Sequence, residues 1–172
     1  MMSYTLTATD TSIKYMQQQI DDEPITNDGV NYTGDQMTII GTFTPAEETT
    51  IDGFVLGGQL AFAKEAKLSE VRIKTVQLIS AGFTHLSMSF PLVLDNRSNY
   101  IGIQVFGGFP YKIQNGDQDD VLPIADQTAY SLFADDGLTR YRYIKDEESE
   151  LIIDIRDATT ITAVNAIVDG RV

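Results

Sequence analysis

Apolar and polar residues alternate along much of this chain, and this alternation constrains the fold more than any other feature. The most regular run extends from Leu86 to Leu94, where apolar side chains occupy every second position. A period of two residues is typical of a strand with one buried face and one solvated face. The sequence predicts roughly ten strands at spacings of about 8–15 residues, which is typical of a β-sandwich or barrel.

The predicted strands share apolar or β-branched residues bounded by polar turns. They cover 4–8, 37–43, 51–62, 71–79, 86–94, 100–106, 110–114, 121–125, 129–133, 138–144, 150–156 and 160–168. Two further interpretations are short helices at 10–20 and 60–68, which contain helix-forming residues.

We therefore expect an all-β fold, a jelly-roll-like antiparallel β-sandwich with extended N- and C-terminal segments. A chain of 172 residues has the length of one domain. The predicted sandwich covers 31–172, and 1–30 is predicted to be an N-terminal arm or a short helix or strand. The polar segments Met1–Val30 and Thr159–Val172 are expected to add strands to a neighbouring subunit.

Charge and residue usage argue against several functions. The net charge of −13 opposes binding to nucleic-acid phosphates, which requires Lys and Arg to replace counterions. The chain contains no Cys, so disulfides and thiolate chemistry are excluded. It contains no apolar run near the ~20 residues of a membrane span, and its start lacks the basic and apolar regions of a signal peptide. We expect a protein made in the cytoplasm, with neither nucleic acid nor membrane as a partner.

The only histidine, His85, is the first candidate for chemistry. It shares a predicted strand face with Ser87, but no G-x-S-x-G turn surrounds either residue. We interpret His85 as a polar residue on an exposed strand face. Asp154 lies inside an apolar run and is expected to point outward, with an inward pair to Arg156 or Arg142 as the alternative. No catalytic residue is predicted, and the protein is expected not to be an enzyme.

The best candidate for a metal site is the acidic stretch from Asn115 to Asp126. Asn115, Asp117, Asp119 and Asp126 occupy positions one, three, five and twelve of a calcium loop. Position six is Asp120, where such loops need Gly, and the last ligand is the shorter Asp. The sequence predicts no resident cofactor and leaves calcium at this loop as an open alternative to an acidic surface turn.

The stretches 71–79 and 86–108, VRIKTVQLI and LSMSFPLVLDNRSNYIGIQVFGG, resemble the paired strands of jelly-roll proteins. The chain is also similar in style to small β-rich accessory proteins of tailed-phage virions, which are acidic, Cys-free and rich in Thr and Asn. This resemblance implies a non-enzymatic virion protein that is made in the host cytoplasm. It points to a capsid decoration or cement protein that forms a homo-oligomer, expected to be a trimer, and binds capsid or tail structural proteins. The resemblance supplies no catalytic residue.

Two other functions stay open at this point. The first is a carbohydrate-binding module of a phage tail fibre or baseplate, which would use exposed tyrosines among Tyr100, Tyr111, Tyr141 and Tyr143. The second is an enzyme with a dispersed acidic site, which would need two acids across a cleft.

Overall fold

The computed structural model describes residues 2–7, 15, 29–33, 36–106, 108–114 and 121–172. The chain divides into two compact units. The first contains Met1–Ser69 and Asp154–Val168, and the second contains Glu70–Ile153 and Asp169–Val172. Each unit is described separately below.

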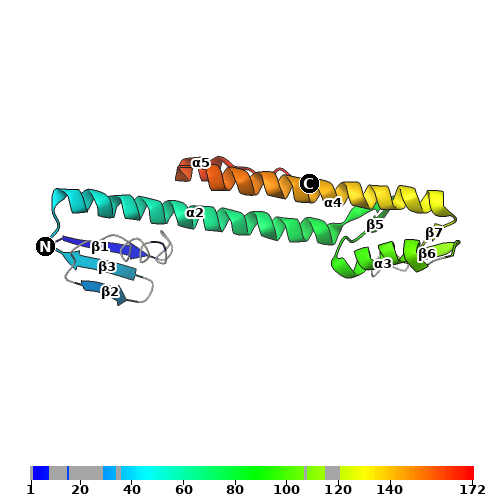
Figure 1. Cartoon of the computed structure of the whole chain (residues 1–172), viewed down its shortest axis with the longest axis horizontal. Coiled ribbons are helices and arrows are strands. Elements are labelled where there is room, and N and C mark those ends of the chain that lie inside the picture. The colour runs from blue at the N-terminus through cyan, green and yellow to red at the C-terminus, as the bar shows by residue number, and fades with distance from the viewer. Residues whose placement is uncertain (1, 8–14, 16–28, 34–35, 107, 115–120) are drawn as a thin grey trace. The chain divides into compact units, whose positions relative to one another are not determined.

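Helices dominate the described residues, so the predicted all-β, jelly-roll-like sandwich is wrong. The helices are α2 (Pro45–Ala81), α3 (Leu94–Phe106), α4 (Gln127–Asp157) and α5 (Ile161–Ala166), as Figure 1 shows. The strands are β1 (Met2–Thr7), β2 (Gly29–Thr33), β3 (Gln36–Gly41), β4 (Phe83–His85), β5 (Met88–Phe90), β6 (Tyr111–Gln114) and β7 (Val121–Ile124). They form one three-stranded sheet and two two-stranded sheets, and none of these sheets is closed.

Several strand predictions are confirmed and the longest ones are wrong. The runs 4–8, 37–43, 110–114 and 121–125 overlap β1, β3, β6 and β7. The runs 51–62 and 71–79 lie in α2, 100–106 lies in α3, 129–133, 138–144 and 150–156 lie in α4, and 160–168 contains α5. Only Met88–Phe90 is a strand within the run 86–94. The helix predicted at 60–68 is confirmed as part of α2, whereas all of 10–20 except Tyr15 lies outside the described residues.

Helix α2 begins and ends at strong local signals. Thr44 and Glu47 form a capping box, in which each main-chain N–H donates to the other side chain, at 2.8 and 3.3 Å. Pro45 occupies the first helical position, where its missing N–H costs nothing. The helix ends at Gly82, whose φ is +75° and whose N–H donates to Leu78 O at 2.9 Å. A Cβ at this position would lie 1.9 Å from a main-chain oxygen, so only glycine fits.

The first unit contains the three-stranded antiparallel sheet in the order β1-β3-β2. Ile39 of β3 lies opposite both Tyr4 of β1 and Val30 of β2. Strand β1 therefore pairs with residues beyond the N-terminal arm that was predicted at 1–30. The buried residues of this unit include Ile39, together with Ile51 and Phe54 of α2.

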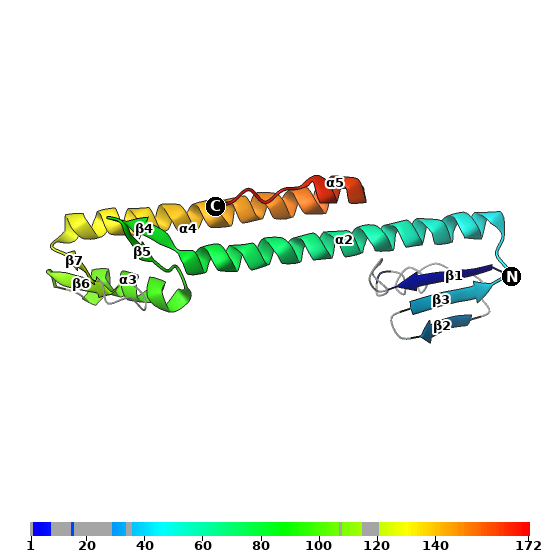
Figure 2. The same cartoon turned by 180° about the vertical axis from the view of Figure 1, so that it is seen from behind.

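An aromatic cluster forms the centre of the second unit. Phe83, Phe90, Tyr100 and Phe133 have ring centroids 5.0–6.3 Å apart, and several pairs are edge-on, an arrangement that aromatic rings favour. Phe83 and Phe90 lie opposite each other in the β4–β5 hairpin. Figures 1 and 2 show this hairpin beside α4. The cluster therefore fixes the hairpin against α4.

None of the helices that the structure describes combines the length and the apolar character needed to cross a membrane.

Candidate functional site

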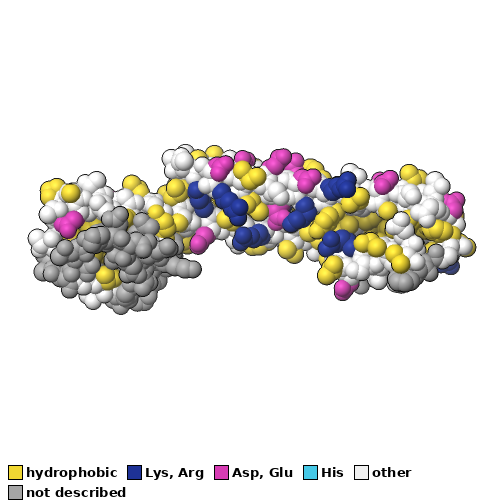
Figure 3. Space-filling view, viewed as in Figure 1, with side chains coloured by type: hydrophobic (Ala, Val, Ile, Leu, Met, Phe, Trp, Pro, Cys, Tyr) yellow, Lys and Arg dark blue, Asp and Glu magenta, His cyan; other side chains and the backbone are white. Residues whose placement is uncertain are grey.

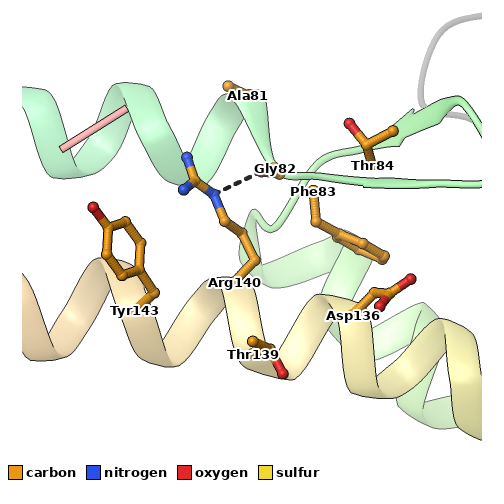
Figure 4. A pocket seen from close by; sticks show the side chains of 8 residues that line it. All are labelled: Ala81, Gly82, Phe83, Thr84, Asp136, Thr139, Arg140 and Tyr143. Atoms are coloured by element: carbon orange, nitrogen blue, oxygen red, sulfur yellow. Dashed lines mark hydrogen bonds between the residues drawn. The ribbon is translucent and has the colours of Figure 1, made fainter.

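The second unit contains an open hollow of about 650 Å³ where α2 ends, β4 begins and α4 passes alongside (Figure 4). Its main-chain boundary is Ala81 and Gly82. The side chains that give it chemical character are Phe83, Thr84, Asp136, Thr139, Arg140 and Tyr143. These comprise one acid, one cation, three hydroxyls and two aromatic rings.

His85 holds the acid of the hollow in place. Its Nδ1 lies 2.7 Å from Oδ2 of Asp136, and its ring meets Phe133 edge-on with centroids 5.5 Å apart. His85 is buried, so the prediction that it lies on an exposed strand face is wrong. The side chain of Asp136 is 53% exposed, so its carboxylate is anchored at one oxygen and still open to solvent.

Arg140, the cation that lines the hollow, is also fixed by contacts. Its Nε donates to Gly82 O at 3.4 Å, and its Nη2 donates to the main-chain oxygen of Val172. Its Cζ lies 5.5 Å from the ring centroid of Tyr143, within the range of a cation–π contact. In Figure 4, Arg140 lies between Tyr143 on one side and Asp136 on the other.

Val172, which accepts the hydrogen bond from Arg140, is preceded by a buried arginine, Arg171. Arg171 is 2% exposed, and all five of its side-chain N–H donors have acceptors. These acceptors are both carboxylate oxygens of Asp169, Thr75 Oγ1 and the main-chain oxygens of Val71 and Ile144. Arg171 therefore connects the last residues of the chain to both α2 and α4 within the second unit. We call Arg171, Asp169 and Thr75 the anchor.

The charges of the anchor shift the pKa values of the acids around it. The hydrogen bond from Arg171 lowers the pKa of Asp169, against the effect of burial, and the charges of Arg171 and Lys74 lower it further. Burial acts to raise the pKa of Glu148, but the hydrogen bond and charge of Lys145, with the charge of Arg171, outweigh it and leave the pKa lowered. Both acids are therefore held in their charged forms by the fold.

The anchor and the hollow are linked through one main-chain contact. Arg171 fixes the segment that carries Val172, and Val172 accepts a hydrogen bond from Arg140. The anchor therefore helps to set the position of the guanidinium that lines the hollow.

The predicted calcium ligands are only partly within the described residues. Asn115, Asp117 and Asp119 lie outside them. Asp126 is exposed, and its Oδ1 accepts a hydrogen bond from Ala129 N at 2.9 Å, so it caps the start of α4. No group of three or more metal-binding side chains occurs among the described residues. Calcium at this loop stays a prediction.

The other candidate residues are separated by the fold. Asp154 is exposed as expected, although it lies on α4 instead of a strand. Tyr100 belongs to the aromatic cluster, and Tyr111 is exposed on β6. Tyr141 packs under the guanidinium of Arg97. Of these tyrosines, only Tyr143 lines the hollow.

The hollow combines residues that the strand interpretation separated, because it put Arg140 on the opposite face from Tyr143 and left Asp136 between two strands. Counted from Asp136, the other α4 residues of the hollow follow after three, four and seven positions, at Thr139, Arg140 and Tyr143. This spacing puts all four along one side of the helix. Recognition of Asp126 as a helix cap would have predicted this grouping. The contribution of Thr84 depends on tertiary structure alone.

No protein-family model, curated protein or solved structure matches this chain.

Proposed function

We propose that the protein is a non-enzymatic structural protein of a virion, a capsid decoration or cement protein that acts as a homo-oligomer. The observation that carries the proposal is an apolar stripe on the outward side of α3. The jelly-roll part of the earlier resemblance is lost, because 71–79 and 100–106 are helical. The acidic, Cys-free composition that resembles virion accessory proteins is unchanged.

Helix α3 is apolar on two opposite sides. Its inner side contains Ile103, which is 4% exposed and belongs to the core. Leu94, Ile101 and Val105 lie along the other side and are 68%, 61% and 63% exposed. These three residues are seven and four positions apart, the spacing of a helix–helix seam. We call them the α3 stripe.

A helix with apolar residues on both sides is usually buried on both sides. Figure 3 shows apolar side chains gathered over the part of the second unit that contains α3. Contiguous exposed apolar surface on a folded protein marks an interaction site. Association of identical chains through the α3 stripe would cover the same surface on every copy, as closed symmetry requires. Such contact across subunit joints would hold a shell together without chemistry.

Light scattering tests the oligomer. We expect a mass that is a multiple of one chain, three times under the trimer hypothesis, and a shift to one chain in Ile101→Asp. A charge in the seam would have to be desolvated without a partner. The matched control is Leu132→Asp on α4, because Leu132 is 60% exposed and lies outside the stripe. This control should retain the wild-type mass.

The second measurement addresses the virion. Density-gradient-purified particles are probed for the protein by mass spectrometry, and stripped particles are then incubated with wild-type protein or Ile101→Asp. Restored particle stability with wild-type protein alone supports the proposal. A strictly monomeric wild-type protein that does not bind particles would contradict it.

A further inference from the structure

We propose that the hollow beside α4 binds a neutral sugar, with Asp136, Arg140 and Tyr143 as the principal contacts. This inference is independent of the α3 stripe and of the virion function. Its first basis is size, because about 650 Å³ lies within the usual range of small-molecule sites.

The lining provides the two kinds of contact that a sugar requires. A pyranose ring has C–H faces that pack on aromatic rings, and hydroxyls that both donate and accept hydrogen bonds. Tyr143 lines the hollow and is 38% exposed, so its ring is accessible to a ligand. Thr84 on β4 and Thr139 on α4 add hydroxyl groups from two elements (Figure 4).

Asp136 is positioned in advance as an acceptor for sugar hydroxyls. Its Oδ2 is paired with Nδ1 of His85 at 2.7 Å, and this pair fixes the orientation of the exposed carboxylate. A hydrogen bond to a charged acceptor is stronger than one between neutral groups. Since His85 is packed on Phe133, little further ordering is needed when a ligand binds.

The occupied Nε edge of Arg140 and the neighbouring carboxylate of Asp136 together favour a neutral ligand over an anion. Carboxylates and phosphates bind arginine best through two parallel hydrogen bonds. On Arg140, Nε and Nη2 already donate to the main-chain oxygens of Gly82 and Val172. Three of its five N–H donors remain, two on Nη1 and one on Nη2, and they can donate to hydroxyl or ring oxygens, whereas the Nε edge is already occupied. The negative charge of Asp136 beside it further disfavours an anion.

The single histidine provides a specific measurement. His85 is the only histidine in the chain and contacts the hollow through Asp136, so its imidazole NMR signals report on this site alone. The wild-type protein is titrated with glucose, galactose, mannose and N-acetylglucosamine, each free and as its methyl glycoside. We expect at least one to shift the His85 signals saturably. Binding of the glycoside identifies the end of a glycan chain as the ligand, and binding of the free form alone identifies a free sugar.

Calorimetry with the same sugar then tests the residues. We expect Asp136→Asn and Tyr143→Ala each to weaken binding by about tenfold, because each removes a principal contact. Tyr111→Ala is the matched control, since Tyr111 is an exposed tyrosine of the same unit outside the hollow. It should bind as the wild type does.

Three results would overturn the inference. One is the absence of a saturable shift with every sugar. Another is displacement of the sugar by acetate or phosphate, which would identify an anion site. The third is equal weakening by Tyr111→Ala and Tyr143→Ala, which would place binding elsewhere.

Discussion

Two ion pairs of the second unit, Arg171–Asp169 and His85–Asp136, differ in burial and in unused hydrogen-bonding capacity. In the anchor, Arg171 is buried with every donor satisfied, and Asp169 contributes both carboxylate oxygens. In the hollow, Asp136 gives one oxygen to His85 and is more than half exposed. An aspartate paired with a cationic or imidazole side chain therefore has two uses in this unit. A fully satisfied buried pair is structural, whereas a partly satisfied exposed pair can still bind a ligand.

The largest expected effect comes from breaking the anchor. Asp169→Asn leaves Arg171 buried without its carboxylate, and loss of one partner of a buried pair costs about 3–5 kcal/mol. We expect the free energy of unfolding, measured by urea denaturation, to fall by about this amount. The matched change Asp136→Asn should cost less than about 1 kcal/mol, because the side chain of Asp136 is 53% exposed and solvent screens its charge. Equal losses in the two variants would remove the distinction between the pairs.

Acid should weaken the anchor and so lower the stability of the fold. The pKa values of Asp169 and Glu148 are lowered in the folded protein from ordinary values of 3.8 and 4.5. Their contribution to stability is therefore complete above those ordinary values and decreases as the pH falls through them toward the lower folded-state values. We expect the urea midpoint to decrease below about pH 4.5, with a shallower decrease in Asp169→Asn. Parallel curves for the two proteins would contradict this.

The substitution Gly137→Ala tests how closely α4 packs against Phe83, which lines the hollow. A Cβ at Gly137 would lie 3.0 Å from the ring of Phe83, which is fixed in the aromatic cluster. Gly137→Ala should therefore cost about 1–3 kcal/mol through overpacking, in spite of the better helix propensity of Ala. Thermal unfolding measures the change. Gly102 of α3 has no atom within 4 Å of its Cβ position, so Gly102→Ala should be neutral or stabilising.

A smaller effect than that of Asp169→Asn is expected at the histidine. His85→Leu keeps an apolar side chain against Phe133 and removes the bond to Asp136, which should cost about 1 kcal/mol. Sugar binding should decrease more than stability does, because Asp136 loses its orientation. Calorimetry and urea denaturation on the same variant compare the two. A stable variant with unchanged sugar affinity would show that His85 does not position the carboxylate.

Part of the architecture could be predicted from the sequence because its signals are local. Strands β6 and β7 coincide with predicted runs, and each is bounded by turn residues. The beginning of α2 at Thr44 and its end at Gly82 are also visible as a capping box and a glycine stop. These signals depend only on neighbouring residues. The strand interpretation followed alternation and did not use these caps.

Alternation was misleading where a helix carries apolar residues on two sides. In α2, Val71 and Thr75 are buried at helical spacing while Ile73 and Val76 are exposed. The same four residues also fit a strand that changes its buried face. In α3, the alternating residues that predicted a strand include members of the exposed α3 stripe. The chain by itself thus specified the boundaries of α2, the positions of β6 and β7, acidity and the lack of thiol chemistry. Which of two possible apolar faces is buried depends on what packs against it, and only the tertiary structure decided that.

The candidate site follows the same division. The spacing of Asp136, Arg140 and Tyr143 is a property of the sequence once α4 is recognised. Two of them are held by partners from elsewhere in the chain, Asp136 by His85 of a hairpin and Arg140 by Val172 at the end of the described residues. These partners are 51 and 32 positions away from the residues they contact. Contacts between such distant residues leave no periodic pattern in the sequence, because they form only when the aromatic cluster and the anchor bring the segments together.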